Sequence, residues 1–500
     1  MLSLLQNKIF RAVALSAVAV VFLQLLVNKR RKRTPLPPGP RGLPIIGNLL
    51  DVPSSFEWLE YMKWSQKYNS DIVSFAVAGA STIILNSQDA VTELMEKRSR
   101  IYSSSMGWSW TFVISPYGPK WNERRTLFVK EFNSTQPERY QPQELKAVST
   151  FLENLIHSPD VFVLHLRHMA GSLIMSATYG IEVAPRGDPY VISADRALDG
   201  FIHAAIHGTF WVDYFPFLKY VPSWIPGASF QRKAKEWKEY ALAMVSKPYQ
   251  EVKSQMANGV FKPCFVYNCL QNVDHEKDVA YQEKVIQETA GSMYFAGTDT
   301  TVTALHSFFL AMVCNPTVQK KAQEELDRVV GYGRLPNHSD EADLPYITAI
   351  MYEVLRQVCS FLLFQVHLPT LIHQDTARKP TRAILHDENL YPDPDTLNPS
   401  RWLTSDGKIN TDMKAPLSSF GFGRRVCPGM HMALSSIWMT IASTLLTFDI
   451  SEKITEDGEI IKLTQEYESS LQNRPLPFAC SINVRSKEHE KLIYSSNILA

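Results

Sequence analysis

Cysteine, net charge and sequence repetition are all low in this chain of 500 residues. Its six cysteines form no C-x-x-C pair and no zinc-like spacing, which argues against a disulfide framework or a zinc module and fits a reducing compartment. The 51 basic and 50 acidic residues nearly cancel, so no nucleic-acid partner is expected. The sequence also contains no internal repeat, no low-complexity domain and no flavin or nicotinamide fingerprint.

The chain begins with an apolar segment followed by a basic cluster. Ile9–Val27 is apolar apart from Arg11, Ser16 and Gln24, and Lys29–Arg33 follows it. About 20 apolar residues suffice to cross a bilayer, and basic residues favour the cytosolic side. We therefore expect a signal-anchor helix with the remainder of the chain in the cytosol. A cleaved signal peptide is the competing interpretation, but no persuasive small-residue cleavage site precedes the basic cluster.

The prolines of Leu36–Pro40 stiffen the connection that follows. With 45% apolar residues, the remaining chain can bury a large core. The predicted organisation is a short lumenal N-terminus (1–8), a transmembrane helix (9–27), a basic and proline-rich linker (28–40) and a folded catalytic domain (41–500).

Cys427 lies in an unusual glycine-rich segment, Phe420–Gly429, beside two arginines. Positive charge and backbone N–H donors stabilise a thiolate, the form in which cysteine binds metals. Gly423 can adopt a left-handed conformation that directs N–H groups at the sulfur. Gly429 has no Cβ and would let a flat ligand approach. The alternative is a buried free cysteine in a glycine-rich turn.

A long helix is predicted from about residue 282 to 315, where Pro316 ends it. Asp299 and Thr300 lie at its centre. The Thr300 hydroxyl can donate back to the carbonyl of Ala296 and loosen the helix locally. Helical spacing places five small or apolar residues on one face with room for a small ligand: Met293, Ala296, Gly297, Thr300 and Ala304. A kink without chemical function is the alternative.

Two further groups of residues have helical spacing. Trp121 and Arg125 share a helix face and can donate to one carboxylate, although an amphipathic helix with an edge tryptophan has the same pattern. Glu353 and Arg356 also share a face and, as an isolated motif, are typical of a solvated ion pair. Arg401 follows in the sequence Asn-Pro-Ser-Arg-Trp.

Local patterns predict further elements. The aromatic-rich segment 201–224 is either plain core or part of a pocket wall. We predict helices at 54–68, 89–98, from 119 onward and 430–446, strands at 71–77 and 81–85, and a β-hairpin formed by 473–478 and 480–484.

Together, these motifs resemble those of the cytochrome P-450 superfamily, in the family's order along essentially the whole chain. Residues 420–429 match every position of its haem-thiolate signature, F-x-x-G-x-R-x-C-x-G. The proline-rich linker and the tail are similar to the membrane-bound microsomal type of the fungal branch. The resemblance implies a mainly α fold with a small β-rich part (α+β), the haem-thiolate fold, behind an N-terminal anchor helix.

The resemblance also implies the cofactor and its residues. Haem b would be bound with Cys427 as the axial ligand of its iron. Arg356, Arg401 and Glu353 would form a buried carboxylate–diarginine cluster with a folding role. The remaining residues implied to surround the haem are Trp121, Arg125, His367 and Arg425 at its propionates, and Phe420, Gly423 and Gly429 near the sulfur.

The implied activity is insertion of one oxygen atom from O2 into a small hydrophobic substrate, often in secondary metabolism. Asp299 and Thr300 would deliver protons. NADPH would act only through a separate NADPH–cytochrome reductase, and the enzyme would be a single-pass protein of the endoplasmic reticulum membrane facing the cytosol. Two alternatives stay open: a haem-thiolate isomerase or dehydratase that needs no reductase, and a non-catalytic haem-binding protein.

Two segments depart from the family pattern. Residues 100–106, around Ser105, stand where members carry a longer loop over the substrate pocket. Between Arg356 and His386, the usual hairpin turn is replaced by Gln374–Thr381, which leaves His367 with weak support from its neighbours. Substrate binding is therefore the least predictable property of this chain.

Overall fold

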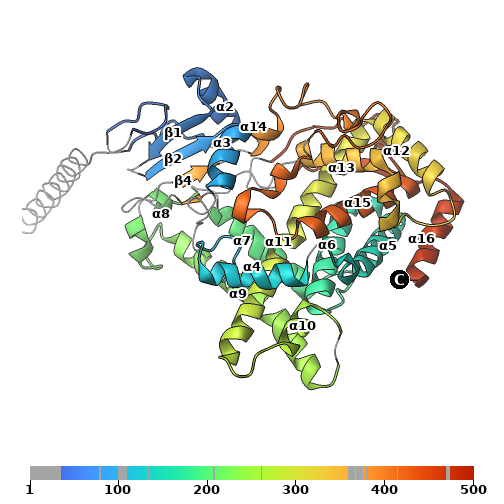
Figure 1. The fold of residues 1–500 in the computed structure, drawn as a ribbon, viewed down its shortest axis with the longest axis horizontal. Coiled ribbons are helices and arrows are strands. Elements are labelled where there is room, and N and C mark those ends of the chain that lie inside the picture. The colour runs from blue at the N-terminus through green and yellow to red at the C-terminus, as the bar shows by residue number, and fades with distance from the viewer. Residues whose placement is uncertain are drawn as a thin grey trace, which may run out of the picture.

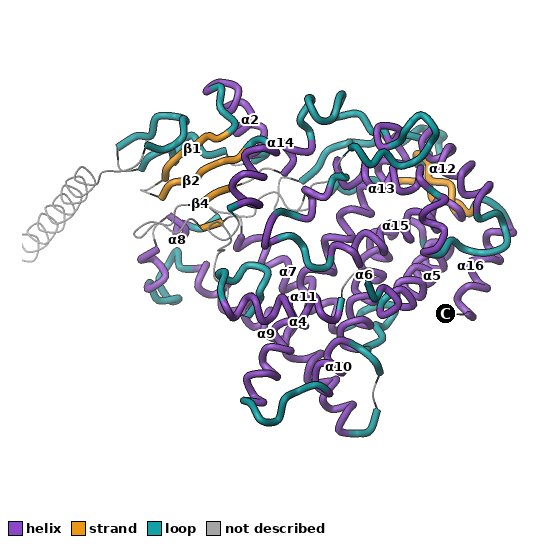
Figure 2. The backbone as a smooth tube through the Cα atoms, viewed as in Figure 1, coloured by secondary structure: helices purple, strands orange, loops and turns teal. Residues whose placement is uncertain are grey.

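The protein is mainly helical, as the sequence predicts, with two small sheets at opposite ends (Figures 1 and 2). It is seen in a computed structural model. The residues that the structure describes are 35–44, 46–53, 55–77, 80–98, 110–132, 135–205, 209–214, 216–260, 262–357, 366–367, 376–378, 381–413, 415–468 and 473–499.

Helices of very different length make up most of the fold. The α-helices are α2 (Glu57–Tyr68), α3 (Gln88–Val91), α4 (Pro119–Glu131), α5 (Gln141–His157), α6 (Phe162–Tyr179), α7 (Pro189–Ala205), α8 (Trp211–Tyr214), α9 (Ser229–Ala257), α10 (Phe265–Gln271), α11 (Val279–Cys314), α12 (Pro316–Val329), α13 (Pro345–Gln357), α14 (Thr381–Leu385), α15 (Met430–Thr447) and α16 (Lys487–Leu499). Shorter turns are η1 (Thr92–Lys97), which is π-helical, and the 3-10 turns η2 (Pro137–Arg139), η3 (Pro159–Val161), η4 (Pro216–Tyr220), η5 (His338–Asp343), η6 (Pro399–Trp402), η7 (Leu417–Phe420) and η8 (Gly423–Arg425).

The larger sheet lies at one end of the molecule beside α2 and α14 (Figure 1). Its strand order is β1-β2-β4-β3, in which β2 pairs antiparallel with β1 and parallel with β4, while β3 and β4 are antiparallel. The strands are β1 (Ile72–Val77), β2 (Ala80–Leu85), β3 (Val366–His367) and β4 (Thr376–Arg378).

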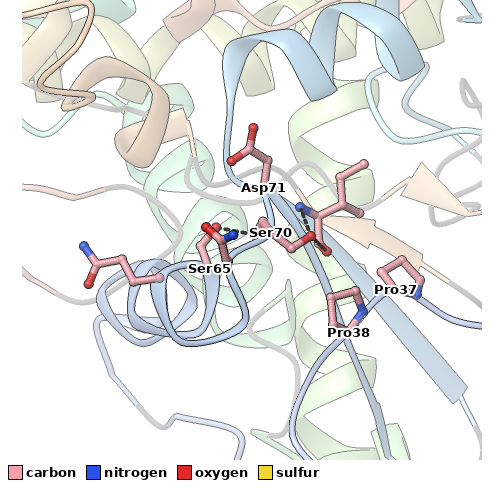
Figure 3. Close-up of a pocket in the computed structure, with 8 residues that line it drawn as sticks. Pro37, Pro38, Ser65, Ser70 and Asp71 are labelled. Atoms are coloured by element: carbon pink, nitrogen blue, oxygen red, sulfur yellow. Dashed lines mark hydrogen bonds between the residues drawn. The ribbon is translucent and has the colours of Figure 1, made fainter.

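The proline-rich linker is bound to this sheet. The Ser74 amide of β1 donates to the Pro38 carbonyl (2.9 Å), and the Ser74 hydroxyl donates to the Pro37 carbonyl (2.6 Å). Both prolines border a shallow surface pocket with residues that connect α2 to β1, including Ser70 and Asp71 (Figure 3). Pro37 and Pro38 therefore extend the edge of this sheet.

The predicted hairpin between residues 473–478 and 480–484 is wrong, because residues 480–484 belong to a second sheet. β6 (Cys480–Val484) pairs antiparallel with β5 (Phe448–Glu452), which directly follows α15, and not with residues 473–478. Residues 473–476 instead pair with the chain just before them, through a bridge between Tyr467 and Pro475. The partner of β6 and the partner of Pro475 each lie earlier in the chain. Local side-chain patterning does not show which earlier segment pairs with which later one.

Helix α11 is the long predicted helix and begins and ends within three residues of the expected positions. The Asp278 side chain caps its start by accepting from the Tyr281 amide (3.0 Å), and Pro316 begins the next helix. Gly297 permits a close crossing with α6, because a Cβ there would lie 2.6 Å from the Ile174 Cδ1 atom. Helices α4, α6, α9, α13 and α15 all pack against α11.

Most other predicted elements are confirmed. The helices at 54–68, from 119 and at 430–446 and the strands at 71–77 and 81–85 correspond to α2, α4, α15, β1 and β2 with shifted ends. The helix predicted at 89–98 is divided between α3 and η1. In the aromatic segment, Phe201 is core, since it is buried against Phe295 with ring centroids 4.7 Å apart, whereas Trp211 is exposed.

The predicted transmembrane segment, residues 9–27, lies outside the described residues. Along the described ranges, no single helix is long and apolar enough to cross a membrane. Helices α11 and α12 reach that length and composition only together, with a bend of 105° between them.

The predicted carboxylate–diarginine cluster is present and buried. Both Glu353 carboxylate oxygens accept from the Arg356 guanidinium (2.9 and 3.0 Å), and Arg401 Nε donates to Oε1 (3.1 Å). The Trp402 indole N–H adds a further donor (2.9 Å), which the sequence reasoning did not identify. Arg356 also donates to the Leu385 carbonyl (2.9 Å), so the cluster connects α13 to the last residue of α14.

Replacing Glu353 by Gln should strongly destabilise the protein. The change leaves the side chains of Arg356 and Arg401 buried without a counter-charge, and loss of one partner of a buried pair costs about 3–5 kcal/mol. Urea unfolding followed by circular dichroism measures the loss. A decrease of about 0.5 kcal/mol or less, the size expected for a surface pair, would contradict the buried-cluster interpretation.

His386, next to this cluster, should make the protein acid-sensitive. Burial, followed by the charges of Arg382 and Arg356, lowers the pKa of His386 to about 3. The unfolded chain would bind a proton there near pH 6.5 while the folded chain would not, so stability should fall as pH decreases from about 6.5 towards 3. His386→Gln should reduce this slope by up to about 1.4 kcal/mol per pH unit in unfolding measurements. An unchanged slope between pH 4 and 6 would refute the assignment.

Candidate active site

One cavity in the described part of the chain contains most of the predicted site residues. We call it the Cys427 cavity. It lies between the segment around Phe420–Gly429, α11, α4, α6 and α15, and its wall is mainly apolar. Its lining residues are Phe112, Val113, Trp121, Arg125, Phe128, Met169, Ala170, Leu173, Ile174, Ser292, Met293, Ala296, Gly297, Thr300, Thr301, Ala304, Leu355, Ser419, Phe420, Arg425, Cys427, Pro428, Gly429, Met432, Ala433, Ser436 and Ile437.

The turn before Cys427 has the predicted backbone geometry. Gly423 has φ of +55°, in the left-handed region that favours glycine. The Cys427 amide donates to the Phe420 carbonyl (2.8 Å), which closes the turn. Cys427, Phe420 and Gly429 all line the cavity, so the sulfur and the residue without a Cβ face the same space.

The charge near the Cys427 sulfur comes from a different arginine than expected. Arg424 donates to the Tyr117 hydroxyl (3.0 Å), and Arg425 donates to the carbonyls of Phe112 (3.2 Å) and Ser115 (2.6 Å). Burial raises the pKa of the Cys427 thiol, while the Gly429 N–H and the charge of Arg125 oppose that rise. Arg125 of α4 is thus the cation that favours the thiolate.

Trp121 and Arg125 face the cavity from α4, as predicted, and Arg425 joins them. The guanidinium carbons of Arg125 and Arg425 lie 5.4 and 4.8 Å from the centroid of the Trp121 ring. Burial and the neighbouring Arg125 charge lower the pKa of Arg425 to about 10. The two cations are adjacent and partly buried, so an anion in the cavity would stabilise both.

This arrangement fits haem b. Among the described residues, Arg125 has no hydrogen bond or ion pair to a carboxylate, so the haem propionates would supply the missing negative charge. Cys427 faces an apolar space, as an axial thiolate ligand would. In the described ranges, no group of three His, Cys, Asp or Glu side chains could hold a different metal ion.

Helix α11 brings the predicted small-residue face to the cavity. Met293, Ala296, Gly297, Thr300 and Ala304 all line it. The Thr300 hydroxyl donates to the Ala296 carbonyl (3.0 Å), which confirms the predicted back-bond.

Asp299, one of the two residues expected to deliver protons, is buried and ion-paired. It is only 6% exposed, and its Oδ2 atom accepts from Arg474 in a close ion pair. Arg474 lies beyond the described segment that ends at Glu468. Burial, together with the charges of Arg474 and Arg167, lowers the pKa of the nearby His306 to about 4. No sequence pattern indicated this partner, because a single arginine 175 residues away has no recognisable spacing.

The remaining predicted positions can be placed only in part. His367 lies in β3, where its backbone pairs with Thr376. Only the backbone of His367 is described. Residues 100–106 and most of the segment between Arg356 and His386 are also outside them. Helix α6 contributes four lining residues that the sequence reasoning missed, because an apolar helix face looks the same in a core and in a cavity.

Comparison with known proteins identifies the family. The Cytochrome P450 family model matches residues 37–478. Cytochrome P450 monooxygenase 98 from Postia placenta is 41% identical, covering 99% of this chain and 98% of its own length. Cytochrome P450 monooxygenase ple1 from Rhodocybe pseudopiperita is 38% identical (93% and 92%), and tryptamine 4-monooxygenase from Psilocybe cyanescens is also 38% identical (92% and 95%).

The matching relatives are fungal monooxygenases and extend over nearly the full length of both chains. The cavity with Cys427 on one element and Thr300 on another agrees with that relationship. The chain therefore belongs to the cytochrome P450 family and is a haem-thiolate monooxygenase of the fungal branch.

Proposed function

We propose that this monooxygenase uses the Cys427 cavity as its active site and oxidises a small hydrophobic organic molecule with O2. The observation that carries the proposal is the meeting of Cys427, Arg125, Arg425 and Thr300 around one mainly apolar cavity. When bound through a thiolate, haem supplies the chemistry that activates O2 and favours cleavage of the O–O bond. An apolar wall excludes water, which protects such a reaction from side products.

The residues named from the sequence would divide the task of holding the cofactor. Cys427 would bind the iron, while Trp121, Arg125 and Arg425, with His367 as a further candidate, would hold the propionates. Phe420 and Gly429 would shape the space beside the sulfur, and Gly423 would set the turn. Neighbouring contacts of this kind tune the electron donation of a metal ligand.

Thr300 and Asp299 are the proposed proton-delivery pair. The Thr300 hydroxyl donates to Ala296 and can still accept a hydrogen bond from a water in the cavity. Asp299 lies next to it in sequence, but its contact with Arg474 keeps the carboxylate paired. Proton transfer through Asp299 would therefore require this ion pair to loosen.

The sequence supports a proposal for the electron supply and for the location. The chain carries no flavin or nicotinamide fingerprint, so we propose a separate NADPH–cytochrome reductase as the electron donor. The apolar segment 9–27 and the basic Lys29–Arg33 support a single-pass anchor in the endoplasmic reticulum membrane with the catalytic domain in the cytosol. The contacts of Pro37 and Pro38 with Ser74 attach the described end of the linker to the domain.

Turnover with 18O2 tests this function. The full chain, a reductase and NADPH should be assayed with a panel of small apolar aromatic compounds that includes tryptamine, the compound in the name of one relative. We expect compound-dependent NADPH oxidation and one labelled oxygen atom per product molecule by mass spectrometry. Product that forms without NADPH and carries no label would instead identify an isomerase or dehydratase.

Thr300→Ala provides an internal check of the proton-delivery role. The variant should retain haem but divert O2 to hydrogen peroxide, so less product forms per NADPH oxidised. Thr303→Ala is the matched control, because the Thr303 hydroxyl makes the same kind of back-bond, to the Asp299 carbonyl (3.1 Å), and does not line the cavity. Equal coupling in the wild type and Thr300→Ala would remove Thr300 from the mechanism.

A further inference from the structure

Helix α4 carries the cavity-facing residues Trp121 and Arg125. The helix is fully described, and its buried side chains are Trp121, Arg124 and Phe128. Trp121 and Phe128 line the Cys427 cavity, and Phe128 also packs against Phe132 with ring centroids 5.4 Å apart. Arg124 is the buried charged side chain of α4, and it does not line the cavity.

Arg124 forms a buried ion pair with Glu288 of α11. Both residues are 7% exposed. Arg124 Nε donates to Glu288 Oε2 (2.9 Å), Nη2 donates to the same oxygen, and Nη1 donates to the Lys120 carbonyl (2.8 Å). The guanidinium is thus fixed by its own helix and by α11, which gives the contact a defined direction.

The direction of this contact determines where Arg125 points. Successive residues of a helix are rotated by about 100°, so Arg124 lies about 60° to one side of Trp121 and Arg125 about 40° to the other. A helix that is held at Arg124 cannot rotate about its axis without breaking the ion pair. The ion pair of Arg124, on one side of Trp121, therefore fixes the position of the Arg125 guanidinium on the other side, at the cavity edge.

Hydrogen bonds extend from Glu288 towards the second cation of the cavity. The Glu288 carbonyl accepts from the Ser292 hydroxyl (2.7 Å), which accepts from the Phe112 amide (3.3 Å). The Phe112 carbonyl in turn accepts from Arg425 (3.2 Å). Glu288 thus contacts α4 through its side chain and, through Ser292, the segment that holds Arg425.

We propose that Arg124 and Glu288 are positioning residues that orient Arg125, Trp121 and Arg425 for the haem propionates. The inference rests on the haem site proposed above and concerns residues that do not line it. Buried ion pairs contribute little net stability compared with apolar residues of similar size, but they define geometry. Removing the pair should therefore weaken haem binding more than it lowers the stability of the fold.

Haem release is the readout. The full-length haem-loaded protein is mixed with excess apomyoglobin, which captures released haem, and the transfer is followed by absorbance. The double variant Arg124→Met/Glu288→Met replaces the pair by apolar side chains and should keep a wild-type unfolding temperature. It should nevertheless release haem roughly tenfold faster or more, because the residues facing the propionates lose their fixed orientation. The single variant Glu288→Gln should release haem faster still.

Two controls separate positioning from general weakening. Glu131→Gln alters a contact at the end of α4 away from the cavity, in which Arg139 donates to Glu131 (2.8 Å), and should leave the release rate unchanged. Asp327→Asn breaks the ion pair with Arg485 away from the cavity and should lower the unfolding temperature without faster release.

Several outcomes would overturn the proposal. A double Met variant that retains haem like the wild type would show that the pair is only structural. Release from Asp327→Asn as fast as from Glu288→Gln would attribute the effect to instability. If wild-type protein binds no haem through a thiolate, the proposed site itself fails, which the spectrum of the starting protein reveals before any variant is made.

Discussion

The proposed haem site depends on stabilising one cysteine thiolate inside an apolar cavity. Burial raises the pKa of Cys427, and the opposing influences within the chain are the Gly429 N–H and Arg125. These contributions come from different parts of the sequence, so the fold must bring α4 onto the turn that carries the cysteine. A metal bound at the sulfur would complete the compensation, since a coordinating thiol is deprotonated.

Buried charged groups surround this site and connect elements that are distant in the sequence. Arg124 and Glu288 join α4 to α11, Arg474 reaches Asp299, and Glu353 gathers Arg356 and Arg401. Each pair is costly to bury and tolerates few alternative geometries. Buried ion pairs therefore have three roles here. They orient α4, hold the Asp299 carboxylate beside Thr300, and fix the chain that leads to the Cys427 turn.

The sequence predicted most of what local chemistry determines. The turn geometry at Gly423, the back-bond of Thr300 and the shared face of Trp121 and Arg125 depend on residues within a few positions of each other. The predictions that needed correction involve long-range contacts. Arg425 faces backbone carbonyls more than 300 positions away, and β6 pairs with β5 because α15 and the tail pack together. Spacing rules contain no information on such pairings.

The two segments that depart from the family pattern follow the same division. The face of α11 could be predicted because helical periodicity defines it, whereas residues 100–106 and 374–381 lack any periodic pattern. Substrate binding was therefore the property that the sequence predicted least. The proposed haem site, in contrast, is built from regular elements and a tight turn, and this explains why its residues could be named in advance.

The reduced carbon-monoxide difference spectrum of the full chain, compared with Cys427→Ser, tests the central claim most directly. The account predicts the red-shifted band of a thiolate-bound haem for the wild type and its loss in the variant. A wild-type protein that binds haem without this band, or a variant that retains it, would contradict the assignment of Cys427 as the ligand.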